Sequence, residues 1–181
     1  MLAIGLMRGV NVGGTGKLPM AAWRALCERI GLEQVRTYIQ SGNVVFVTRE
    51  KDLAAIATQM EAAIEKEFGF HRPALLLSLE DLRGVVKRNP FPAGRDPAKL
   101  IVSFLAGAIG DETRAKVAEL AQGHPEELIC HERELFVYFP NGQGRTKLPL
   151  AKIEKALGVA CTARNWNTVL KLVEMAEASG G

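Results

Sequence analysis

The sequence has little of several features that would assign a protein to a class at once. Its 181 residues include three cysteines and three histidines, and aromatic side chains make up 6%. An odd number of scattered cysteines argues against a disulfide framework. No pair of cysteines or histidines has the spacing of metal ligands. We therefore expect reduced thiols, no structural metal and no cofactor.

Long apolar segments and a strong charge imbalance are also missing. The N-terminal apolar run 2–7 is too short for a signal peptide or a membrane span, and no other segment approaches about 18 apolar residues. The formal charge of +3 is far below that of a dedicated DNA-binding domain. These observations predict a cytoplasmic protein that makes no contact with a membrane.

What the sequence does contain is an alternation of β-rich and helical patterns, punctuated by glycine and proline. In the first half we expect strands at 2–7, 35–39, 44–47 and 74–79, and helices at 19–30, 51–68 and 80–88. In the second half we expect strands at 100–105, 128–130, 135–139 and 159–162, and helices at 112–121, 148–157 and 165–178.

This element order predicts an α+β protein with two ferredoxin-like halves in tandem. Strand, helix, hairpin, helix, strand is the ferredoxin-like βαββαβ pattern, and each half is followed by one extra helix. The proline-rich segment 89–97 is the best candidate for a linker. We therefore divide the chain into halves at 1–92 and 93–181, and their common element order suggests a duplication.

Four segments resemble the family called domain of unknown function 1697. They are RGVNVGG at 8–14, VRTYIQSGNVVF at 35–46, GQGRTK at 142–147 and TARNWNT at 162–168. The resemblance runs from Leu6 to Met175, and Thr15 and Gly16 depart from it where a bulkier polar pair is common. It implies a bacterial cytosolic protein with two ferredoxin-like halves and no assigned activity, so it supplies no catalytic residues.

The loop 8–17 is the first candidate site, because it joins a strand to a helix. At this position backbone N–H groups can surround an anion. Glycines such as Gly13 and Gly14 permit close backbone approach, and Arg8 and Lys17 flank the loop with charge. A Walker A loop would need glycine at Asn11 and serine or threonine at Leu18, so that type of nucleotide site is not expected.

The turn 40–43 belongs beside this loop in a ferredoxin-like half. Gln40, Ser41 and Asn43, together with Asn11, could orient a polar ligand there. The alternative is that the glycines serve geometry alone and that these polar groups hold the loop still.

A second candidate site lies at one end of the second half. Arg145 and Lys147 follow its third strand, and Arg164 follows its fourth, with Asn165 as the N-cap of the last helix. Three cations at a helix N-terminus would attract an anion. The alternative is that Arg164 is buried in an internal interaction and that Trp166 belongs to the core.

Other chemistry is less well supported by the sequence. Phe136 and Tyr138 share a strand face, as aromatics of RNA-recognition sheets do, but the first strand of the chain has none. The pair Cys130-His131 would point to opposite faces of a strand, so no nucleophile and base are predicted. The carboxylates near the second hairpin, among them Glu126 and Glu134, have the pattern of a solvated turn.

The leading hypothesis is therefore a binding module for a small anionic ligand, which could be a nucleotide, a phosphate or a nucleic-acid phosphate. Two alternatives stay open: an enzyme of unrecognised type acting on a phosphorylated or carboxylated metabolite, and a protein–protein adaptor. Whether the protein is an enzyme, and its oligomeric state, are not predicted.

Overall fold

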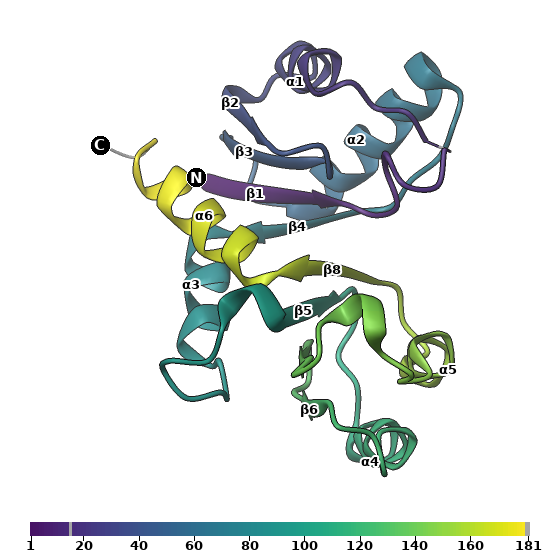
Figure 1. Cartoon of the computed structure of the whole chain (residues 1–181). Helices are drawn as coiled ribbons and strands as arrows, with labels where there is room; N and C mark the ends of the chain where they lie inside the picture. The colour runs from purple at the N-terminus through teal and green to yellow at the C-terminus, as the bar shows by residue number, and fades with distance from the viewer. Residues whose placement is uncertain (15, 180–181) are drawn as a thin grey trace. The chain divides into compact units, whose positions relative to one another are not determined.

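The computed structural model describes residues 1–14 and 16–179 and contains two four-stranded sheets, one in each of two units (Figure 1). One unit holds Met1–Gly84 and the residues from Leu170 onward, and the other holds Val85–Val169. The elements of the first half are β1 (Leu2–Met7), α1 (Met20–Arg29), β2 (Glu33–Tyr38), β3 (Asn43–Val47), α2 (Leu53–Phe68), β4 (Ala74–Ser78) and α3 (Leu79–Lys87).

The first sheet has the strand order β2-β3-β1-β4, and every neighbouring pair is antiparallel. This is the order of a ferredoxin-like βαββαβ unit. In the central strand, Ile4 pairs with Val45 on one side and Leu77 on the other. Because β1 and β2 are each antiparallel to β3, the loop after β1 and the β2–β3 turn lie at the same end of the sheet.

Helices α1 and α2 pack on one face of this sheet and enclose its main core (Figure 1). Trp23, Phe46 and Met60 are completely buried there. Burial of each such side chain contributes about 1.5–3 kcal/mol. Helix α2 begins at the side chain of Asp52, which accepts from the backbone N–H groups of two following residues.

The second half repeats this topology. Its elements are β5 (Leu100–Leu105), α4 (Asp111–Leu120), β6 (Glu127–Cys130), β7 (Glu134–Tyr138), α5 (Leu150–Leu157), β8 (Cys161–Asn165) and α6 (Trp166–Glu177). The strand order is β6-β7-β5-β8, again antiparallel throughout. The expected fold class, two ferredoxin-like halves with an extra helix after each, is therefore confirmed.

Several local features differ from the sequence prediction. Strand β8 lies at Cys161–Asn165 instead of 159–162. Two short 3-10 helices, Pro97–Lys99 and Gln143–Arg145, were not expected. The proline-rich segment 89–97 packs on the second sheet, since the Phe91 and Tyr138 rings lie 5.9 Å apart. Arg95 pairs with Glu127 and stacks over Tyr138 at 4.6 Å.

The tight packing of the β2–β3 turn gives a direct test of this fold. Gly42 has φ 71°, and a Cβ there would lie 2.6 Å from Met7 Cβ and 2.7 Å from Val10 Cγ2. We expect Gly42→Ala to lower the free energy of unfolding by about 2–5 kcal/mol, because backbone strain and overpacking act together. Urea unfolding measures the change.

Gly31 offers a matched control for that substitution. It has φ 91°, but nothing lies within 4 Å of a Cβ placed on it. Gly31→Ala should therefore lower the free energy of unfolding through backbone strain alone, by about 1–2 kcal/mol. Equal effects of the two substitutions would contradict the packing described here.

Candidate functional site

Three segments meet at one end of the first sheet and form what we call the basic loop cluster: the described residues of 8–18 (8–14 and 16–18), 39–43 and 70–73. The Met7 N–H donates to Gly42 O at 3.2 Å, which joins the end of β1 to the β2–β3 turn. The Arg8 N–H donates to Pro73 O at 2.9 Å, which joins it to the segment before β4. The prediction that the glycine-rich loop and the turn 40–43 are neighbours is confirmed.

The Asn11 side chain holds the cluster together. Its Oδ1 accepts from the Leu18 N–H at 2.8 Å, while its Nδ2 donates to Leu18 O at 2.9 Å and to Gln40 O at 3.0 Å. Asn11 has φ 55°, a left-handed conformation that asparagine tolerates better than most residues. The amide of Asn11 is therefore occupied in closing the loop, which is the structural role that the sequence left open.

The glycines of the loop divide into two kinds. Gly13 and Gly14 have φ 63° and 76°, are exposed, and have no atom within 4 Å of a Cβ placed on them. Gly16 has φ 64° and lies against Arg72, whose Nε is 3.2 Å from such a Cβ. Gly16 therefore lets the guanidinium approach the loop, whereas Gly13 and Gly14 present open backbone to the solvent.

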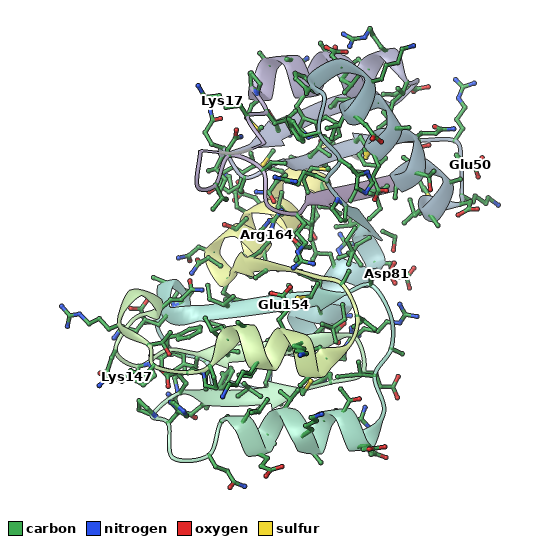
Figure 2. All side chains as sticks on the ribbon, turned by 90° about the vertical axis from the view of Figure 1, so that its right-hand side faces the viewer. Lys17, Glu50, Asp81, Lys147, Glu154 and Arg164 are labelled. Carbon is green, nitrogen blue, oxygen red and sulfur yellow. The ribbon has the colours of Figure 1, made fainter. Side chains whose placement is uncertain are left out.

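The charge of the cluster is of one sign. Residues 1–27, 34–49 and 68–79 contain no aspartate or glutamate. Arg72 donates from Nε to Gly9 O at 3.1 Å and lies over the Phe70 ring at 5.6 Å. Lys17 is exposed and extends from the ribbon (Figure 2), and Arg8 is half-buried. An anion would therefore meet cations and backbone N–H groups but no carboxylate from these three segments.

The polar residues of the β2–β3 turn have different roles. Asn43 is completely buried, and its Nδ2 donates to Tyr38 O at 3.1 Å and to Ser41 Oγ at 2.8 Å. It stabilises the turn and is not available to orient a ligand. Gln40 is exposed, and the bond from Asn11 goes to its backbone carbonyl. Of these turn residues, Gln40 can best place an amide group toward a ligand.

The candidate residues of the second half are brought together only in part. Arg145 and Lys147 are exposed, and Lys147 extends from the ribbon (Figure 2). Asn165 caps α6 as predicted, because its Oδ1 accepts from the Asn167 N–H at 3.0 Å. Its Nδ2 donates to Ala98 O at 2.9 Å, so this side chain is also a structural tie.

Arg164 corrects the prediction that three cations converge at this end. Its side chain is buried and turns back along β8, donating from Nη1 to Thr162 Oγ1 at 2.9 Å and to Ala163 O at 2.8 Å. Burial lowers the pKa of the Arg164 guanidinium to about 10, so it keeps its charge at neutral pH. Strand pleating explains the difference, since the side chain follows the strand face and not the following loop.

A second correction concerns the carboxylates near the second hairpin. Glu126 is 7% exposed, and its Oε1 accepts from Thr146 Oγ1 at 2.6 Å. Its Oε2 is buried without a partner among the described residues. Glu134 is also buried and pairs with Arg88 at 2.6 Å. These residues fix loops to the sheet, a role that periodicity and composition do not indicate.

The side chains of the aromatic strand and of the Cys130-His131 pair are engaged in contacts within the fold. Phe136 packs between His131 at 5.5 Å and Trp166 at 6.0 Å, so its ring is enclosed. Burial raises the pKa of the Cys130 thiol to about 11, and its Sγ faces His131 O at 3.7 Å. Within residues 1–14 and 16–179, no group of three or more metal-ligating side chains is close enough to hold an ion.

The fold and these loops define an α+β protein of two ferredoxin-like halves, with a glycine-rich basic loop in the first. The chain belongs to the family described as protein of unknown function (DUF1697), whose model matches residues 1–136. This confirms the resemblance drawn from four sequence segments, of which the two in the first half lie inside the matched region.

A solved structure of a conserved bacterial protein from Streptococcus pneumoniae is similar along the whole chain. It has 26% sequence identity and a TM-score of 0.72, and the alignment covers 97% of this chain and 98% of that one. No curated protein matches the sequence. Among the helices of the described residues, none is long and apolar enough to cross a membrane.

The role of Asn11 can be tested at the buried Leu18, which is 0% exposed. Asn11→Gly keeps the left-handed backbone but leaves the Leu18 N–H without its acceptor. We expect a loss of about 1–3 kcal/mol in the free energy of unfolding, together with faster hydrogen exchange at the Leu18 amide. NMR-detected hydrogen exchange follows the Leu18 amide and a control amide in one sample.

The Met7 amide is the internal control in that spectrum, because its bond to Gly42 O does not involve the Asn11 side chain. Its protection should change only by the global loss of stability. Unchanged protection at Leu18 would show that Asn11 does not close the loop.

Proposed function

We propose that the protein binds a small anionic ligand, through a phosphate or carboxylate group, at the basic loop cluster of the first half. The observation that carries this proposal is the exposed backbone of Gly13 and Gly14 in a loop that Asn11 holds closed. Successive N–H groups in a turn can form a concave set of donors that suits an anion. Lys17, on the same loop, supplies the charge.

The shape of the loop supports binding because hydrogen bonds inside the protein hold it in place. Asn11 makes three hydrogen bonds inside the cluster, and Arg72 Nε donates a further one to Gly9 O. A pre-formed site loses less conformational entropy on binding than a loop that must become ordered. The three segments themselves contribute no carboxylate that would compete with an anion. The carboxylate of Glu65, from α2, lies 3.9 Å from His71.

In the second half, Arg145 and Lys147 are the remaining cations that could contribute to anion binding. Arg164 is left out of this proposal because its guanidinium bonds to its own strand. Asn165 is left out because both ends of its amide serve the fold. We therefore assign the principal site to the first half.

A cytoplasmic setting is supported by the cysteines, because the three thiols form no disulfide.

A protein–protein adaptor is the second candidate. The observation in its favour is that Asn11, Asn43 and Asn165 all serve internal hydrogen bonds, as expected if the polar loops are purely structural. In that case no small anion would bind at Gly13 and Gly14. No observation on the described residues of the cluster favours an enzyme acting at the same loops.

The proposal is tested by titrating pyrophosphate into the full chain and following backbone amides by NMR. We expect the Gly13 and Gly14 amide resonances to shift. Lys17→Ala should weaken binding about tenfold or more, because a charge-assisted hydrogen bond is lost. Lys51→Ala is the matched control, since Lys51 is exposed and precedes α2 at the opposite end of the sheet.

Two results would overturn the proposal. One is the absence of any shift at Gly13 and Gly14 up to millimolar pyrophosphate. The other is an equal loss of affinity in the Lys17 and Lys51 variants, which would indicate non-specific attraction by net charge.

A further inference from the structure

Ile39 has a backbone conformation that is unusual for a β-branched residue. It lies directly after β2 with φ 47°, although it is β-branched, and it is 50% exposed. A β-branched residue at positive φ is strained, and strain of this kind persists where the surrounding structure or the function requires it. The exposed side chain gains little from burial to offset the strain, and asparagine or glycine would fit this backbone better.

Val12 is a second apolar side chain that the fold leaves in water. It is 65% exposed, and together with Ile39 it is one of the two most exposed large apolar residues in the described part of the chain. The hydrogen bond from Asn11 Nδ2 to Gln40 O joins the residues next to them. The methyl groups of both residues therefore belong to the same basic loop cluster as Lys17, Gly13 and Gly14.

The combination indicates more than a site for a bare anion. Phosphate needs donors and positive charge, whereas two exposed β-branched side chains suit a flat apolar surface. Gln40, which follows Ile39 directly, is exposed and has an amide that can both donate and accept at the edge of a heterocycle. Apolar contact, an orienting amide and an anion-binding loop are together the chemistry that recognises a base, its edge and its phosphate.

We propose that the ligand of the basic loop cluster is a nucleoside phosphate, with its base against Val12 and Ile39 and its phosphate at Gly13, Gly14 and Lys17. This inference rests on the proposed function and adds the ligand class to it. The nucleoside phosphate can be free or the end of a nucleic acid, and both present the same base and phosphate. The left-handed backbone at Ile39 is maintained, in this account, to present its side chain to the base.

The first experiment compares ligands by calorimetric titration of the full chain. The ligands are inorganic phosphate, ribose 5-phosphate, the four common nucleoside 5′-monophosphates and a short single-stranded oligonucleotide. At least one nucleotide should bind about tenfold or more tightly than ribose 5-phosphate, because the base adds apolar contact. A mononucleotide that binds as well as the oligonucleotide identifies a free ligand, and tighter binding of the oligonucleotide identifies a nucleic acid.

The second experiment uses variants at Ile39, directly after β2, and at Val12 in the glycine-rich loop. Ile39→Asn relieves the strain, so its melting temperature should stay the same or rise by about 2–4 °C. Its affinity for the nucleotide should fall about tenfold, while its affinity for ribose 5-phosphate stays the same. Val12→Ser should reduce nucleotide affinity in the same selective way.

Gln34 provides the matched control, because it is exposed on β2 at φ 52° but is polar and precedes the loop cluster by several residues. Gln34→Asn should leave both affinities unchanged. Equal binding of ribose 5-phosphate and nucleotides, unaffected by Ile39→Asn, would overturn the nucleoside and leave the anion site standing. Loss of stability without selective loss of nucleotide affinity would show that Ile39 serves the fold alone, and binding of none of these phosphates would overturn both proposals.

Discussion

The arrangement of the first half depends on the hydrogen bonds of one side chain, the amide of Asn11. By bonding to both backbone groups of Leu18 and to the carbonyl of Gln40, it closes the glycine-rich loop and attaches it to the β2–β3 turn. Gly13 and Gly14 are exposed in this closed loop, with open space beside their backbone. Lys17 and Gln40 lie in the same cluster. The same bonds occupy the Asn11 amide, so Asn11 is no longer a candidate for orienting a ligand.

Much of this could be predicted from the sequence, because topology and local chemistry agree. Glycine and proline mark the ends of most elements, and the order of strands and helices is enough to predict the ferredoxin-like sheet order. That order in turn places the loop after β1 beside the β2–β3 turn, which the Met7 to Gly42 hydrogen bond confirms. The family resemblance could be drawn from the same loop and hairpin, since both lie in the region matched by the family model.

The remaining features depend on side-chain directions and backbone angles that no periodic pattern encodes. Arg164 follows the face of its strand and bonds to Thr162, although its position in the chain suggests an exposed loop cation. Glu126 belongs to an acidic segment whose composition predicts exposure to solvent. It is nevertheless buried and accepts a hydrogen bond from Thr146. The positive φ of Ile39 is a single backbone angle that no residue pattern specifies. Its strained and exposed state could therefore not be predicted from a hydrophobic residue that follows a strand.

The central claim is that a closed loop with open glycine backbone receives an anion without rearranging. A crystal structure of the full chain soaked in pyrophosphate tests it most directly. The account predicts the anion within hydrogen-bond distance of the Gly13 and Gly14 N–H groups, with the three Asn11 hydrogen bonds retained. An anion bound elsewhere, or a loop in which Asn11 has released Leu18 and Gln40 to admit it, would contradict the account.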